Sequence, residues 1–147
     1  MTDLSNIEVF TVLEVNSRMP LLSRIMHDLR EAWTRRRGVL GRLRHFRRAG
    51  ARACSVEVAE TIRNLEDQER QLEAEVTALE HEIHQLGGIV KDPGRGVVNF
   101  FSQRDGSLVF LSWMLGEDEV HYWHDLEAGL GERQRLTENP DLSPTSE

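Results

Sequence analysis

The sequence predicts an α+β fold: a long, coiled-coil-like antiparallel helical hairpin over about residues 20–87, followed by a three-stranded antiparallel β-meander over about residues 97–126. Two heptad stripes predict the hairpin, because apolar residues at alternating spacings of three and four bury themselves only against another helix. The meander is predicted by a change of period from about 3.6 to two after Gly87-Gly88. It is also predicted by Asp105-Gly106, a strong two-residue hairpin signal.

Local signals mark the start of the helical part. Thr11 and Glu14 form a capping-box pattern, with Phe10 placed to pack against the helix entry, and they predict a short helix over about residues 12–18. Proline suits the first turn of a helix but not its interior, so a second helix is expected to begin at Pro20.

The two heptad stripes are joined by residues 49–54, which break the pattern and contain Gly50, so the turn of the hairpin is predicted there. Pairing the stripes across this turn places Arg36 opposite Glu69. These are the polar positions of the two seams, and we expect them to form an ion pair that fixes the alignment of the helices. The apolar partners expected in this register are Leu22 with Ile83, Leu29 with Val76, and Leu43 with Ile62.

Charge is unevenly distributed over the hairpin. Residues 30–52 contain nine arginines and one glutamate, a balance of +8, whereas residues 57–86 contain nine acids and two arginines, a balance of −7. We expect the two helices to neutralise each other across the hairpin. The alternative is a nucleic-acid site at the arginine-rich end, which a net charge of −7 and the scarcity of aromatic residues there disfavour. Its candidate residues are Arg35, Arg37, Arg44 and Arg48.

Loop lengths predict how the strands of the meander pair. A two-residue loop pairs Arg104 with Ser107, and a four-residue loop pairs Leu115 with Val120. In this register His124 lies on the core face of the sheet. The opposite face is also too apolar to meet water, so either the N-terminal segment or a second copy of the chain should cover it, and we favour the second copy. The three predicted strands are 97–103, 108–115 and 120–126.

Composition places the chain among cytoplasmic proteins that form one domain, here residues 1–136. The single Cys54 excludes an internal disulfide framework. The acidic N-terminus does not resemble a signal peptide, and no apolar run is long enough to span a membrane. Residues 137–147 are polar with two prolines and are expected to be a disordered tail.

The richest polar cluster lies at residues 117–125, where carboxylates and imidazoles of the kind that bind zinc, manganese or iron gather. Strand geometry sends His121 and His124 to opposite faces, so a shared metal would need a bulge. A neutral, hydrogen-bonded histidine is the plainer interpretation of His124. The preferred functional site is a polar pocket for a divalent metal or small ligand where the sheet meets the helices, formed by Glu117, His124 and Arg133, with His121 as a further candidate. Glu117 and Arg133 are also candidates for an ion pair.

A further set of residues is spread over nearly the whole chain: Phe10-Thr11, Glu14, Asn16, Pro20, Gly88 to Asp92, Arg95 to Val98, Phe100, Arg104 to Gly106, Trp113, Leu115 to Glu117, Trp123-His124, Gly129 and Arg133. In these residues the chain resembles a bacterial domain family of unknown function, DUF2203. The resemblance covers nearly the whole chain and implies a helical hairpin with a small sheet and no assigned activity. The chain departs from the family pattern at Asn99, where aspartate is common, at Ser112, where cysteine is frequent, and between Gly129 and Arg133.

From these observations we expect a non-enzymatic, homodimeric interaction or scaffold module. The heptads and the doubly apolar sheet account for most of its informative residues. Two alternatives stay open: a metal- or small-ligand-binding protein that uses the polar pocket, and a nucleic-acid-binding accessory protein that uses the arginine-rich end of the hairpin.

Overall fold

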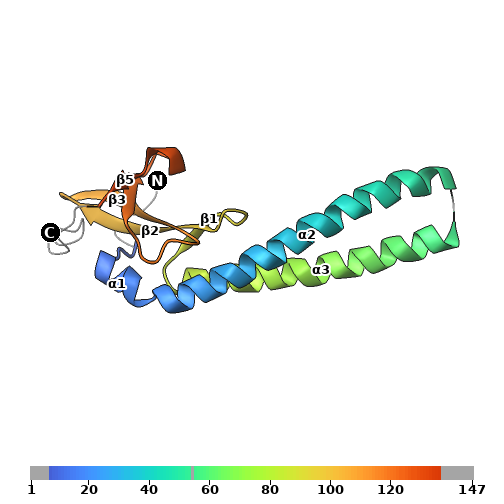
Figure 1. Cartoon of the computed structure of the whole chain (residues 1–147), viewed down its shortest axis with the longest axis horizontal. Helices are drawn as coiled ribbons and strands as arrows, with labels where there is room; N and C mark the ends of the chain where they lie inside the picture. The colour runs from blue at the N-terminus through green and yellow to red at the C-terminus, as the bar shows by residue number, and fades with distance from the viewer. Residues whose placement is uncertain (1–6, 54, 137–147) are drawn as a thin grey trace.

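The computed structural model describes residues 7–53 and 55–136 and confirms the α+β class. A small antiparallel sheet sits at one end of a long helical hairpin, and most of the hairpin projects away from the sheet (Figure 1). The elements are α1 (Val12–Ser17), α2 (Met19–Ala53), α3 (Val56–Gln85), β1 (Ile89–Asp92), β2 (Val97–Arg104), β3 (Ser107–Met114), β4 (Tyr122–Asp125), the 3-10 helix η2 (Leu130–Glu132) and β5 (Gln134–Arg135). We call the pair α2 and α3 the arm.

The capping box at the start of α1 is confirmed. The backbone amide of Thr11 donates to Glu14 Oε1 at 2.8 Å, and the amide of Glu14 donates to Thr11 Oγ1 at 3.0 Å. Phe10 is buried, and its ring meets that of Phe100 edge to face. Its backbone amide donates to the carbonyl of Phe101, so the N-terminal segment is anchored to β2.

The predicted register of the arm is confirmed. Arg36 Nε lies 2.8 Å from Glu69 Oε2, and a terminal nitrogen of Arg36 lies 3.6 Å from Glu73. Near the sheet, the stripes of both helices join one core cluster that includes the two predicted pairs Leu22 with Ile83 and Leu29 with Val76. Farther out, a second and smaller cluster is built on Val39, Leu43 and Leu65, with Ile62 packed against it.

The position of the hairpin turn was predicted wrongly. Helix α2 continues through Gly50 to Ala53, and α3 begins after Ser55, whose hydroxyl caps it by accepting hydrogen bonds from the amides of Glu57 and Val58. A glycine inside a helix costs only about 1 kcal/mol relative to alanine. Here it has a packing role, because a Cβ at Gly50 would lie 3.2 Å from Val58 Cγ1. Gly50 therefore lets the two helices approach closely near the tip.

The sheet has five strands in the order β1-β2-β3-β4-β5, two more than predicted. The missed strands are β1 and β5, which have four and two residues. The inner face of the sheet packs on the base of the arm. Its core residues are Val98, Phe100, Leu111 and Trp113, which share a cluster with Leu22, Met26, Leu29 and Ile83 of the arm.

The predicted pairing of β2 with β3 is confirmed along its whole length, from Arg104 with Ser107 to Val97 with Met114. The predicted pairing of β3 with β4 is wrong by one residue. Phe110 pairs with His124, whereas the prediction paired Phe110 with Asp125. A shift of one residue turns every side chain of a strand to the other face. His124 therefore lies on the outer face and not among the core residues Phe100 and Leu111.

The register shift follows from the loop between β3 and β4, which spans residues 115–121 and is longer than the predicted four-residue turn. Its Glu117 folds back, so that its carboxylate accepts a hydrogen bond from the amide of Met114 and its carbonyl accepts one from Trp113 Nε1. Val120 is buried in the main core, and its amide donates to Asn16 Oδ1 of α1. These tertiary contacts remove Val120 from the strand ladder.

The outer face of the sheet is largely buried within one chain. Its residues are Val97, Asn99, Phe101, Phe110, Ser112, Met114, Tyr122 and His124, and five of these are buried. Residues 126–136, which we call the covering segment, return along this face and end in β5. The reason for expecting a second copy on this face is therefore removed, although the dimer itself stays a prediction.

Two further predictions concern the C-terminal tail and membrane-spanning segments. The disordered tail, residues 137–147, lies outside the described residues, as does Cys54. Within the described residues, none of the helices combines the length and the apolar character needed to cross a bilayer.

A candidate ligand pocket on the outer face

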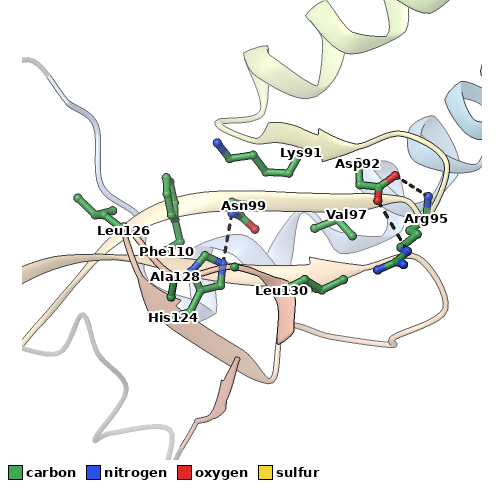
Figure 2. A pocket seen from close by; sticks show the side chains of 11 residues that line it. Lys91, Asp92, Arg95, Val97, Asn99, Phe110, His124, Leu126, Ala128 and Leu130 are labelled. Carbon is green, nitrogen blue, oxygen red and sulfur yellow. Dashed lines mark hydrogen bonds and ion pairs between the residues drawn. The ribbon is translucent and has the colours of Figure 1, made fainter. Parts of the chain in front are cut away.

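A pocket of about 340 Å³ opens on the outer face, between the sheet and the covering segment. Its floor comes from β2, β3 and β4, one rim from β1 and the turn that follows it, and the other rim from the covering segment (Figure 2). The residues that line it are Lys91, Asp92, Arg95, Val97, Asn99, Phe110, His124, Leu126, Ala128, Gly129 and Leu130. We call this cavity the pocket.

The floor carries a buried polar pair, Asn99 and His124, each 3% exposed. His124 Nδ1 lies 2.8 Å from the carbonyl oxygen of Asp125, which can only accept, so Nδ1 carries the proton. In the neutral ring Nε2 is then an acceptor, and it lies 3.5 Å from Asn99 Nδ2, which donates to it (Figure 2). The ring also meets the edge of Phe110, with centroids 5.7 Å apart. His124 is thus held in one orientation.

Asn99 is left with an unused acceptor. Its Oδ1 is buried and accepts no hydrogen bond from the residues that the structure describes. The same is true of Ser112 Oγ, on the residue paired with Asn99 across β2 and β3. A buried polar group without a partner costs about 1–3 kcal/mol. Unused hydrogen-bonding capacity is therefore concentrated at the centre of the outer face.

The rim at β1 is charged. Arg95 Nε lies 3.8 Å from Asp92 Oδ2, and the amide of Arg95 donates to Asp92 Oδ1, so the charge of Asp92 is shared with Arg95. Lys91 forms no ion pair with any described residue, and its Nζ lies 5.4 Å from the centroid of the Phe110 ring. The turn rests on the arm, because a Cβ at Gly94 would lie 2.8 Å from the ring of Trp33. The net charge of this rim is positive.

The opposite rim is fixed by Arg133. Its terminal nitrogen donates to both carboxylate oxygens of Glu117, at 2.7 and 2.9 Å, and to the carbonyl of Ser112 at 3.2 Å. The guanidinium carbon lies 4.0 Å from the centroid of the Tyr122 ring. The covering segment is further tied by Leu136, whose amide donates to the carbonyl of His121. Arg133 therefore connects the covering segment to β3, β4 and the loop between them.

The four predicted site residues separate in the structure. Glu117 and Arg133 form the predicted ion pair, but each is engaged by the other and by the backbone. His121 contacts Asp118 at 2.9 Å on the surface, and this hydrogen bond lowers the pKa of the Asp118 carboxyl. His124 lies in the pocket, on the floor. Over the described ranges, no three histidines, cysteines or acids are grouped as they would be to hold a metal ion.

The candidate nucleic-acid residues all lie on α2 and are exposed: Arg35, Arg37, Arg44 and Arg48. Arg37 stacks on Trp33, with its guanidinium carbon 5.0 Å from the ring centroid. The expected neutralisation across the arm is only partial. Among the described side chains, ion pairs between α2 and α3 come from Arg36 and Arg47 alone.

Sequence reasoning missed the pocket residues Lys91 and Arg95 and gave Asn99 no role in binding. Asn99 had one signal, since it departs from the pattern of the family that the chain resembles. Lys91 had another, as the only lysine of the chain. Neither signal indicated that these residues line one pocket with His124.

Comparison with known proteins gives one match. The family described as "Uncharacterized conserved protein (DUF2203)" matches residues 8–136, which is nearly the whole chain. The comparisons with curated proteins and with solved structures found no match.

Proposed function

The chain belongs to the DUF2203 family, whose description assigns no activity, and we propose from its geometry that it is a small-ligand-binding protein whose site is the pocket. One observation carries this proposal. Asn99 is 3% exposed and lines the pocket, yet its Oδ1 has no hydrogen-bond donor among the described residues. A ligand that donates to Oδ1 would offset the cost of burying it.

Size and composition support the same function. A volume of about 340 Å³ lies at the lower end of the range for small-molecule sites. Five of the eleven lining residues are apolar and five are polar or charged, so the pocket offers a ligand both apolar and polar contacts. In this function His124 and Asn99 face the ligand, whereas Glu117 and Arg133 hold the covering segment in place.

A fragment screen tests the proposal. Nitrogen-15 NMR spectra of the protein are recorded with a set of neutral and charged fragments, and we expect shifts to concentrate on the residues that line the pocket. Ala128→Trp should fill the pocket and abolish these shifts. Glu127→Trp, at the adjacent exposed position, should leave them unchanged. Fragments that shift no lining residue, or that shift them equally in Ala128→Trp, would contradict the function.

We propose homodimeric association through the arm as a second function, since a specific observation favours it. The outer part of the arm has a small core, in which only Val39, Leu43 and Leu65 are buried among the described side chains. A hairpin of two helices that buries so little apolar surface becomes more stable when it packs on further helices. The unequal charges of α2 and α3 favour a second copy, with the basic helix of each chain on the acidic helix of the other.

Light scattering tests this association. At micromolar concentration we expect a dimer that dissociates as salt is raised, because exposed ion pairs are screened. Reversing two arginines of α2, Arg44→Glu with Arg48→Glu, should give a monomer. A monomer of wild-type protein at low salt would refute the dimer.

A further inference from the structure

The arrangement of charge around the pocket restricts what it would bind. Arg95 lies at one end of the pocket, and the side chain of Lys91 points away from it, toward the end formed by Phe110 and Leu126 (Figure 2). Arg95 shares the charge of Asp92, whereas Lys91 has no acidic partner among the described residues. The end of the pocket at Lys91 is therefore the end that favours a negative group.

The centre of the pocket restricts the ligand in a second way. His124 Nε2 is engaged by Asn99 Nδ2, so the hydrogen-bonding group that the floor offers is the oxygen of Asn99, an acceptor. A ligand must therefore bring a donor, such as a hydroxyl or an amine. The lining beside Lys91 is apolar, since Phe110 and Leu126 lie on the side of Asn99 away from Arg95 (Figure 2).

We infer that the ligand is a small amphipathic acid, with a carboxylate at Lys91, an aliphatic or aromatic body against Phe110, and a hydrogen-bond donor at Asn99 Oδ1. This inference rests on the proposed ligand-binding function and deepens it. The three contacts come from β1, β3 and β2, so the fold brings together residues that lie apart in the sequence. The positive charge of Lys91 at the exposed rim favours a ligand with a negative charge. The buried acceptor Asn99 Oδ1 favours a ligand with a hydrogen-bond donor.

The probes are short acids that differ in one group at a time. Butanoate, hexanoate and octanoate, each with a hydroxyl on the terminal carbon, supply both the carboxylate and the donor at three lengths. Hexanoate without the hydroxyl lacks the donor, and hexanediol lacks the carboxylate. Dissociation constants are measured by nitrogen-15 NMR from the shifts of the side-chain amide of Asn99 and of the lining backbone amides.

We expect one of the hydroxy acids to bind best, because length must match the separation of Lys91 and Asn99. Loss of the hydroxyl should weaken binding about fivefold, the value of one net hydrogen bond. Loss of the carboxylate should weaken it about two- to fivefold, because the ion pair is exposed. Lys91→Met should remove the preference for acid over diol. Arg95→Met is the matched control and should largely keep it, because Asp92 already engages Arg95.

Asn99→Leu should remove the preference for the hydroxy acid over the plain acid. If this variant does not fold, the comparison of the two acids on the wild-type protein still tests the role of the hydroxyl.

Two negative outcomes are distinguishable. If neutral fragments shift the lining residues but the hydroxy acids bind no better than hexanediol, the acid assignment is overturned while the pocket remains a binding site. If neither acids nor fragments shift the lining residues, both the acid assignment and the ligand-binding function fall.

Discussion

Replacement of Arg133 by methionine tests how the pocket is closed. The change keeps most of the side-chain volume but removes the guanidinium, which binds both oxygens of Glu117 and the carbonyl of Ser112. It also removes the charge above the ring of Tyr122. Arg135 provides a matched control, because it lies near the same ring at 5.8 Å but is exposed.

The expected magnitude follows from burial. The side chains of Arg133 and Glu117 are 11% and 20% exposed, so their ion pair is mostly buried. Removing one partner of a fully buried pair costs about 3–5 kcal/mol, because the other charge loses its compensation. Glu117 keeps the amide of Met114 and some contact with water, so we expect a loss of about 2 kcal/mol in the free energy of unfolding. The melting temperature should fall by about 4–8 °C.

The assay is urea unfolding of the wild type, Arg133→Met, Glu117→Gln and the double variant, with Arg135→Met as the control. The double-mutant cycle should show a coupling above about 1 kcal/mol. The control should lose at most about 0.5 kcal/mol. Hydrogen exchange should accelerate in residues 126–136 of Arg133→Met. Equal losses in Arg133→Met and Arg135→Met, with unchanged exchange, would refute the role given to Arg133.

Three further predictions concern single positions. Gly38→Ala should stabilise the protein by about 0.5–1 kcal/mol in urea unfolding, because nothing lies within 4 Å of the added Cβ and alanine favours the helix; a loss would show that the position is not open. Gly87→Ala should cost at least about 2 kcal/mol in the same assay, since φ is +94° and the Cβ would lie 2.2 Å from Phe10 Cζ; unchanged stability would contradict this geometry. The hydrogen bond from His121 lowers the pKa of Asp118, so His121→Asn should raise this pKa, and carbon-13 NMR titration measures the change. Because the pKa of Asp118 is lower in the folded protein than in the unfolded chain, its contribution to stability is present above the unfolded pKa. That contribution is lost as the pH falls through the folded pKa.

The sequence was sufficient for the elements whose geometry is local. The hairpin of β2 and β3 was predicted residue by residue, because a two-residue loop at Asp105-Gly106 permits only one register. The register of the arm was predicted by pairing the two heptad stripes, and the predicted contact of Arg36 with Glu69 is present. The capping box of α1 likewise depends only on residues within one helical turn.

Features set by distant contacts were not predictable in the same way. The length of the loop before β4 is fixed by the contacts of Glu117 and by the hydrogen bond between Val120 and Asn16. No local sequence pattern predicts these contacts. The resulting shift of one residue moved His124 to the other face. Strand β1 is too short for an alternating pattern, so its Lys91 could not be placed beside the pocket. Of the four predicted site residues, only His124 lines the pocket.

The contact of Gly94 with Trp33 joins the rim of the pocket to the arm. From Trp33 to the end of α2 at Ala53 there are twenty residues, or about 30 Å of helix at about 1.5 Å per residue. The outer part of the arm therefore extends well beyond its contact with the rim. By geometry alone, a change of about 5° in its direction at Trp33 would move the tip by about 3 Å.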